Sequence, residues 1–271
     1  MTRHCHHCGA EGAVPEQCPS CGNQDLQPFG RGTQRLEARL AELLPEARIL
    51  RVDRDAARTP AMWAQMLDSI HNHEADILVG TQMLAKGHDF ARLTLVGVVG
   101  ADASLFAADF RAAERLFAQL MQVGGRSGRA ELPGEVLVQT EYPHHPLYQA
   151  LVAHDYPGFA ALQLDERQAA GFPPFAAHAI LRAEAPQLAG ALDFLHCAAA
   201  AAEPLPDSVV FYDAVPMRLA RRANMERAQL LVESSSRRDL QALLADWLPK
   251  LYALKSPRDL FWHVEVDPLE L

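Results

Sequence analysis

The chain has 271 residues, a hydrophobic fraction of 49% and a formal net charge of −9 at pH 7. This length predicts two packed domains with a small additional module. No run is long and apolar enough to span a bilayer, and the first residues lack the apolar core of a secretory signal. We therefore expect a soluble, cytoplasmic protein with no membrane partner. The negative charge argues against a general nucleic-acid coat, because contact with phosphates then needs a local basic patch.

Four of the five cysteines form two C-x2-C pairs in the first 21 residues, Cys5 with Cys8 and Cys18 with Cys21. Each pair is followed by a glycine, which frees the backbone amides to turn toward the thiolates. Four thiolates satisfy tetrahedral Zn²⁺, and a reducing compartment favours metal over disulfide. Residues 1–28 are therefore predicted to be a partial zinc-binding module. The short loop between the pairs leaves open whether one ion takes all four cysteines.

The next region alternates predicted helices and strands. Apolar spacing, breakers and β-branched runs predict helices over 34–44, 60–71 and most of 102–130, and strands over 48–52, 75–80, 93–99 and 134–140. This alternation predicts a doubly wound α/β domain with a parallel sheet. Asp53 and Asp55 follow the first strand, in a ligand loop or in a plain turn, and both interpretations stay open.

The stretch from Gln122 to Arg129 reads Gln-Val-Gly-Gly-Arg-Ser-Gly-Arg. Arg126 and Arg129 are three residues apart, so their guanidinium groups can lie on one side of a turn, and the glycines allow close approach of a ligand. A guanidinium stays charged and binds phosphate oxygens with two parallel hydrogen bonds. Both arginines are candidates for binding a triphosphate; a glycine-rich turn with solvated arginines is the alternative.

The remainder is predicted to form a second α/β sandwich. A helix over 146–168 and a breaker over 171–175 precede strands over 178–183, 208–214, 229–233 and 261–266 and helices over 187–202 and 237–251. From the breaker onward this is β-α-β-β-α-β, the split ferredoxin-like order. A loop over 218–227 is predicted between the central strands. Its arginines, Arg218, Arg221, Arg222 and Arg227, either contact DNA or are solvated.

Several of these stretches occur together in a known order. They are the paired cysteines, Gly32-Thr-Gln-Arg-Leu-Glu37, Gly80-Thr-Gln-Met-Leu-Ala-Lys-Gly-His-Asp-Phe90, Ala108-Asp-Phe-Arg-Ala-Ala-Glu-Arg115, Gln122 to Arg129 and the closing Val266-Asp-Pro268. Along nearly its whole length the chain resembles the C-terminal half of the PriA family, the primosomal proteins N′ that act as replication-restart DNA helicases of superfamily 2.

The resemblance implies a second RecA-like motor lobe over 29–163 and a C-terminal ferredoxin-like (S10-like) domain over 164–271. Gln122, Arg126 and Arg129 would form motif VI, with Arg129 as the arginine finger and Arg126 near the γ-phosphate.

Motif V would comprise Thr81, Gly87 and Asp89 and couple the nucleotide to the bound strand. Thr81 can donate to a DNA phosphate, and Gly87 lets the loop with Asp89 reach the nucleotide cleft.

The resemblance also implies how zinc is bound. Family members hold two Zn²⁺ ions with eight interleaved cysteines, so Cys5 and Cys8 would belong to one ion and Cys18 and Cys21 to the other. Half of the ligands would then lie upstream of this sequence. Taken alone, the four cysteines could still share one ion.

The implied activity is that of an ATP-dependent 3′–5′ DNA helicase, which recognises stalled or collapsed forks and initiates primosome assembly. The implied partners are branched and single-stranded DNA, single-strand-binding protein and primosome proteins, and the protein is expected to be a monomer. At the family's aromatic positions in the C-terminal domain stand Glu226 and Ala228, which weakens the expected binding of single strands.

The sequence contains no G-x4-G-K-[ST] phosphate loop and no Asp-Glu metal-binding box after a predicted strand. ATP and Mg²⁺ would therefore be bound mainly by a lobe outside this sequence, and we expect no ATP hydrolysis by the chain alone. The alternative is a non-catalytic zinc-ribbon scaffold that binds DNA or protein.

Overall fold

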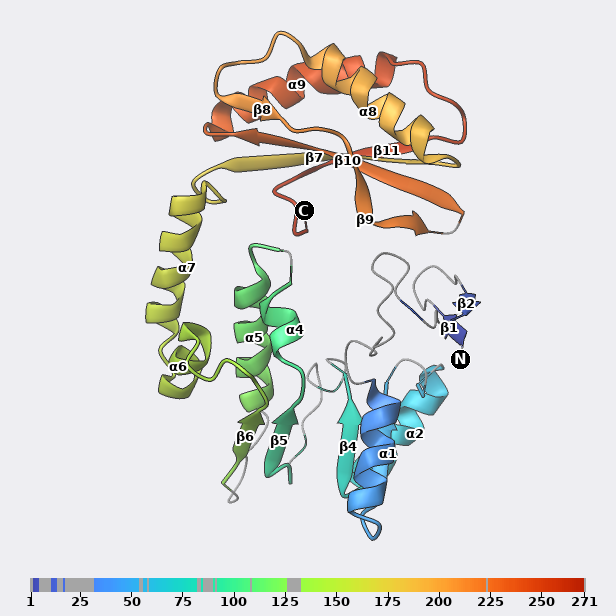
Figure 1. Ribbon diagram of the computed structural model, residues 1–271, viewed down its shortest axis with the longest axis vertical. Helices are drawn as coiled ribbons and strands as arrows, with labels where there is room; N and C mark the ends of the chain where they lie inside the picture. The colour runs from blue at the N-terminus through green and yellow to red at the C-terminus, as the bar shows by residue number, and fades with distance from the viewer. Residues whose placement is uncertain are drawn as a thin grey trace. The chain divides into compact units, whose positions relative to one another are not determined.

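The computed structural model describes residues 32–270 apart from 54–55, 58, 82–83, 85–89, 91, 108, 126–132 and 223. Of the first 31 residues it describes 2–4, 11–13 and 17, and at 2–4, 11–13, 218 and 219 it describes the backbone alone. The chain divides into two compact units, residues 27–162 and residues 163–271, the latter grouped with 1–26. Both units combine helices with strands (Figure 1), which confirms the mixed α/β class.

The first unit contains two pairs of parallel strands, β3 with β4 and β5 with β6. Each pair is joined by a helical crossover, the connection that parallel strands require. The elements of the unit are α1 (Thr33–Leu43), β3 (Ile49–Val52), α2 (Pro60–His71), β4 (Ile77–Gly80), β5 (Leu95–Val98), α4 (Asp102–Leu105), α5 (Ala112–Gly124), β6 (Glu135–Val138) and α6 (Pro146–Ala153). Its core packs α5 against α6 and the start of the following helix, where Phe117 stacks on Phe159 with ring centroids 4.2 Å apart.

The prediction of helix over most of 102–130 is confirmed at 102–105 and 112–124, but the helix is interrupted between these two segments, and 126–130 lie outside the described residues. Residues 106–107 and 109–111 lie in turns and bends between α4 and α5. In the turn, the Asp109 carboxylate accepts a hydrogen bond of 2.8 Å from the backbone nitrogen of Arg111 and pairs with Arg115 at 3.1 Å. Aspartate favours such local bonds over a helix interior, so a helix begins after it rather than through it.

The helix predicted over 146–168 is likewise two helices, α6 and α7 (Tyr156–Ala170). His154 ends α6 in the left-handed conformation, with φ 54°. Pro157 follows, and in one continuous helix its ring would clash with a carbonyl of the preceding turn. It is tolerated in the first turn of α7.

The second unit is built on an antiparallel sheet with the strand order β11-β7-β10-β8, and β9 also pairs with β10. Its elements are β7 (Ala177–Ala185), α8 (Leu188–Ala202), β8 (Val209–Phe211), β9 (Val215–Arg222), β10 (Met225–Ser234), α9 (Arg237–Ala253) and β11 (Phe261–Val266). Helices α8 and α9 cover one face of the sheet (Figure 1). The chain order is the predicted β-α-β-β-α-β with one additional strand, β9.

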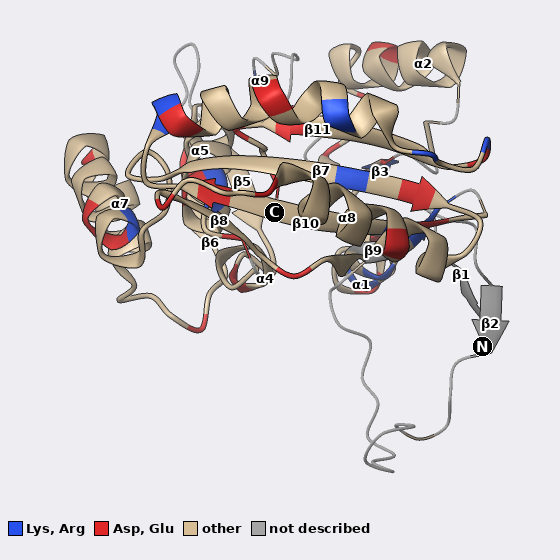
Figure 2. Cartoon of the chain, turned by 90° about the horizontal axis from the view of Figure 1, so that it is seen from above, with Lys and Arg blue, Asp and Glu red and all other residues tan. Residues whose placement is uncertain are grey.

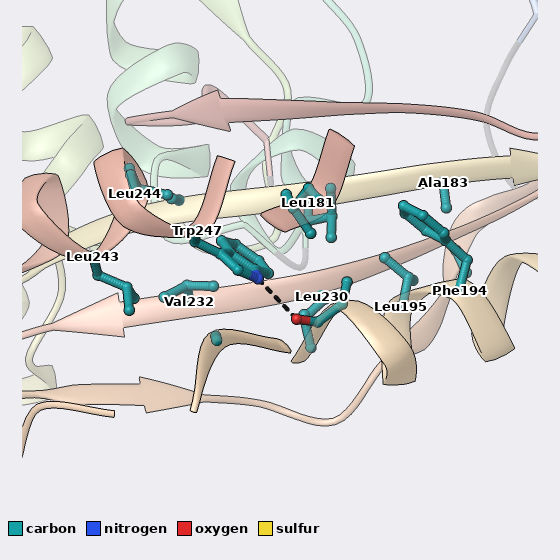
Figure 3. Packing of buried hydrophobic residues seen from close by; sticks show 14 of the residues in the cluster. Leu181, Ala183, Phe194, Leu195, Leu230, Val232, Leu243, Leu244 and Trp247 are labelled. Carbon is teal, nitrogen blue, oxygen red and sulfur yellow. Dashed lines mark hydrogen bonds between the residues drawn. The ribbon is translucent and has the colours of Figure 1, made fainter. Parts of the chain in front are cut away.

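The core of this unit lies between the sheet and the two helices. Alternate residues of β7 and β10 point into it, among them Leu181, Leu230 and Val232, all at most 2% exposed. Trp247 of α9 fills the centre, and its Nε1 donates a hydrogen bond of 2.8 Å to the carbonyl of Ala198 in α8 (Figure 3). This bond lets an indole be fully buried without an unsatisfied donor.

Residues 218–227 are not the loop that we predicted. Residues 218–222 lie in β9 and residues 225–227 in β10, and the two strands pair as an antiparallel hairpin with Arg222 opposite Met225. Asn224 in the turn has φ 64°, a conformation that asparagine tolerates better than most residues. The alternation of apolar residues along β10 was visible in the sequence, whereas the four arginines of 218–227 led to the prediction of a loop, although β9 pairs with β10 at the edge of the sheet.

Candidate nucleotide and nucleic-acid sites

The carboxyl ends of β3 and β4 lie side by side, because Val52 is the register partner of Gly80. Asp53 and Thr81, the next residues, therefore come at the same edge of the sheet, where α/β proteins place ligand loops. A Cβ atom at position 80 would lie 2.5 Å from the carbonyl oxygen of Val52 and equally close to the Leu84 side chain. Gly80 is thus required by the packing that positions Thr81.

Asp53 is buried and bound within the protein. Its carboxylate accepts a hydrogen bond of 2.5 Å from Thr33 Oγ1 and one of 2.8 Å from the backbone nitrogen of Ala56, and Arg51 Nε lies 3.2 Å away. These contacts connect the start of α1 to the end of β3. Of the two interpretations left open for Asp53, the structure favours an internal structural role; Asp55 lies outside the described residues.

Thr81 and Gln122 are both exposed. Within the described part of the chain the Thr81 hydroxyl makes no hydrogen bond, so it is available to an external acceptor. Gln122 lies in the last turn of α5, whose opposite face buries Leu116, Phe117 and Leu120. This places the start of the predicted arginine turn on the outer face of the helix.

The remaining predicted ligands of the nucleotide and of zinc lie outside the described residues. They are Arg126, Arg129, Gly87, Asp89 and the four cysteines, Cys5, Cys8, Cys18 and Cys21. The antiparallel strands β1 (Thr2–His4) and β2 (Glu11–Ala13) are described, and the connection between them contains the first cysteine pair. Within the described residues, no group of three or more His, Cys, Asp or Glu is arranged to hold a metal ion.

A second polar cluster lies where β5 and β6 end. The Asp102 carboxylate accepts hydrogen bonds from Thr140 Oγ1 at 2.5 Å, from the backbone nitrogen of Glu141 at 2.8 Å and from the Tyr148 hydroxyl at 3.2 Å. Burial opposes ionisation, but the three hydrogen bonds outweigh it and lower the pKa of Asp102 below its ordinary value. The cluster ties both strand ends to α6, and sequence reasoning missed it.

The sheet face opposite α8 and α9 carries paired charges. His178, Arg182 and Glu184 of β7 alternate with core residues, so they point to this face. Arg182 Nη1 lies 2.6 Å from Glu265 on β11, and His178 Nε2 lies 3.0 Å from Glu233 on β10.

Figure 2 shows a basic residue followed by an acidic residue along β7. The two arginines of this face, Arg182 and Arg227, already have carboxylate partners, Glu265 and Glu184, which makes the face a poor surface for phosphates. In the sequence, the alternation of polar and apolar residues along β7 was the signal that could have identified this face.

The arginines of the β9–β10 hairpin differ in availability. Arg227 is 12% exposed and its Nε donates a hydrogen bond of 2.9 Å to Glu184. Arg221 is 65% exposed, and among the described residues its one ion contact is a long one of 3.6 Å with Glu226. Arg222 is exposed and has no ion pair with any described residue. Arg218 lies in β9, and its side chain is outside the described part. The free basic charge of the hairpin is therefore near its turn.

Comparison with known proteins finds relatives of one family along nearly the whole chain. Residues 168–269 match the family described as "Primosomal protein N C-terminal domain". The chain is 38% identical over 274 residues to "Replication restart protein PriA" of Haemophilus influenzae, covering 98% of this chain and 36% of that protein. It is 38% identical over 270 residues to the protein of the same name from Synechocystis sp., covering 98% and 32%.

The corresponding Bacillus subtilis protein is 44% identical over 171 residues, covering 63% of this chain and 21% of that protein. The second unit is thus a primosomal C-terminal domain, a mixed α/β domain. The chain belongs to the PriA family and corresponds to a C-terminal part of its members. It spans about a third of the length of the first two relatives. None of the helices in the described residues is long and apolar enough to cross a membrane.

Proposed function

We propose that the chain is the second motor lobe and the C-terminal domain of an ATP-dependent DNA helicase that restarts replication at stalled or collapsed forks. The observation that carries this proposal is the similarity to replication restart proteins along 98% of the chain. It includes the stretches around Thr81 and from Gln122 to Arg129, whose residue types suit phosphate and DNA contacts.

Within this proposal the two units have different tasks. In residues 29–163, a RecA-like lobe, Gln122, Arg126 and Arg129 act on ATP and Mg²⁺ bound mainly by another lobe, with Gly87 and Asp89 near the nucleotide. Thr81 contacts a DNA phosphate; its exposure and free hydroxyl support this role. Residues 164–271, with ferredoxin-like element order, bind DNA through Arg218, Arg221 and Arg222, with Arg227 contributing less because of Glu184.

The proposed partners follow from the same similarity. They are branched and single-stranded DNA, single-strand-binding protein and primosome proteins. We propose that the four cysteines hold Zn²⁺, Cys5 and Cys8 on one ion and Cys18 and Cys21 on another, each completed by ligands outside this sequence.

The test is DNA-stimulated ATP hydrolysis by a protein that joins this chain to a family lobe carrying a phosphate loop. Arg126→Ala and Arg129→Ala should each lower kcat by about 10³-fold or more, because an arginine finger neutralises charge in the transition state. Arg39→Ala is the matched control, because Arg39 lies on the exposed surface of α1 and pairs with Glu42. The chain alone should hydrolyse no ATP.

Two results would contradict the proposal: turnover by the chain alone, or full activity in both arginine variants. A joined protein that binds zinc and DNA but shows no stimulated hydrolysis would instead favour the zinc-ribbon scaffold.

A further inference from the structure

The loop that joins α9 to β11 carries two free cations. Lys255 and Arg258 are both exposed, and neither has a hydrogen bond or an ion pair with any residue that the structure describes. This contrasts with the neighbouring elements of the same unit. Lys250 pairs with Asp246 at 2.8 Å and Arg237 with Asp267 at 2.9 Å. Phosphate binding needs cations whose charge is not already neutralised, so this loop has the capacity that the sheet face opposite α8 and α9 lacks.

An exposed aromatic ring lies just before these cations. Tyr252, in the last turn of α9, is 78% exposed. Its ring centroid is 4.9 Å from that of Trp262 on β11, and Trp262 is 6.0 Å from Phe194 on α8. Trp262 lies beside the Tyr252 ring, and most of the Tyr252 side chain is exposed to solvent. A tyrosine ring has few rotatable bonds and loses little conformational freedom when it binds a flat partner.

We propose that Tyr252, Lys255 and Arg258 form a contact site for single-stranded DNA, in which a base stacks on the Tyr252 ring and the two cations bind flanking phosphates. An aromatic platform combined with unpaired basic residues is the usual way to bind single strands without reading their sequence. The site rests on the DNA-binding role proposed above, and it deepens that role with a contact on different elements from the β9–β10 hairpin.

This site also changes how the C-terminal domain is expected to bind. The family's aromatic positions in the β10 strand are occupied by Glu226 and Ala228, which suggested weak binding of single strands. Tyr252 supplies a stacking ring at another position of the same unit. Sequence reasoning missed it because Tyr252 and Trp262 are brought together by the packing of α9 on β11.

The experiment measures binding of a fluorescein-labelled 20-nucleotide oligothymidine to the 271-residue chain by fluorescence anisotropy. Tyr252→Ala should weaken binding by about 5-fold or more, the size of one base–aromatic stacking contact, and Tyr252→Phe should restore wild-type affinity. Lys255→Ala combined with Arg258→Ala should lower the slope of log K against log salt by about 1.4, two phosphates on a single strand.

Two controls separate stacking from loss of structure. Tyr212→Ala removes another exposed tyrosine, one whose hydroxyl is hydrogen-bonded to the Glu233 carboxylate and is therefore poorly suited to a polyanion; binding should not change. An oligonucleotide with abasic sites should bind the wild type as weakly as the normal strand binds Tyr252→Ala, and the variant should lose nothing further. All variants should keep the wild-type unfolding temperature, because the substituted side chains are exposed.

The possible failures are distinct. If Tyr252→Ala and the double variant bind like the wild type while Arg221→Ala with Arg222→Ala does not, the Tyr252 site is refuted and DNA binding by the domain stands. If the wild-type chain binds no DNA at all, both the site and the DNA-binding role of the domain are refuted.

Discussion

Arg227 on β10 donates a hydrogen bond of 2.9 Å to Glu184, its register partner on β7. The two side chains are 12% and 32% exposed, so the pair is partly shielded from water and salt. An arginine in this position stabilises the sheet, and its charge is largely neutralised before any DNA arrives.

We therefore expect Arg227→Ala to change stability more than DNA binding. It should lower the unfolding temperature by about 2–4 °C, because it leaves Glu184 without its partner. The dissociation constant for single-stranded DNA should stay within about twofold, whereas Arg222→Ala should weaken binding and reduce the salt slope by about 0.7. Thermal unfolding and anisotropy measure the two effects. Glu184→Gln should tighten DNA binding, because it removes the carboxylate that neutralises Arg227. Weaker binding in that variant would contradict our interpretation.

A second prediction concerns the close contact between β3 and β4. Gly80→Ala should lower the free energy of unfolding by about 1–3 kcal/mol, because the new methyl group would overlap the Val52 carbonyl oxygen. Denaturant unfolding measures the difference. Gly97→Ala in β5 is the matched control, because nothing lies within 4 Å of a Cβ at that position. It should change stability by no more than about 0.5 kcal/mol. Equal effects in the two variants would show that the close contact does not exist in solution.

The third prediction concerns pH. The pKa of Asp102 is lower in the folded protein than in the unfolded chain, so the unfolded state binds its proton first as the pH falls. The stabilisation by Asp102 is therefore present above the unfolded pKa, about 4, and is lost as the pH falls through the folded pKa.

Asp102→Asn should accordingly lower the unfolding temperature by about 2–4 °C at pH 7 and by much less near pH 3. Differential scanning calorimetry over this range measures the effect. Asp246→Asn serves as the control, because Asp246 is exposed and pairs only with Lys250 within the described residues. A difference for Asp102→Asn that does not diminish toward pH 3 would show that the carboxylate charge is unimportant.

The fourth prediction concerns metal. The 271-residue chain should bind about one Zn²⁺ or bind it weakly, because only half of the proposed eight ligands are in this sequence. Inductively coupled plasma mass spectrometry after dialysis against a mild chelator measures the content, and Cys5→Ser with Cys18→Ser should abolish it. Cys197→Ser is the control, because Cys197 is free, exposed and remote in sequence from the two pairs. Two tightly held ions per chain would disprove the interleaved arrangement.

Local sequence patterns were sufficient for most of the regular elements. The helix predicted over 60–71 is observed as α2 (Pro60–His71), where Thr59 caps the helix and Pro60 begins it. The strand predicted over 261–266 is observed as β11 (Phe261–Val266). Both have signals within the segment itself, a cap with a proline in one case and an aromatic and β-branched run in the other.

The errors occurred where a competing local bond or a distant partner decides the conformation. The turns at Asp109 and at His154 interrupt apolar spacing that continues through them, so periodicity alone predicted helices that were too long. The hairpin around Asn224 was predicted as a loop because β9 gains its strand conformation from pairing with β10, not from its own residues.

The amino-acid sequence by itself determined the α/β class, the order of most helices and strands, and the identity of the cysteines and arginines proposed to bind zinc, nucleotide and DNA, because these depend on residue types at fixed spacing. Only the tertiary structure decided which charges are available. Arg227 is neutralised by Glu184, 43 residues away in the chain, while Lys255 and Arg258 remain unpaired among the described residues beside an exposed Tyr252. Ion pairing depends on distance in space, and sheet register and helix packing set that distance.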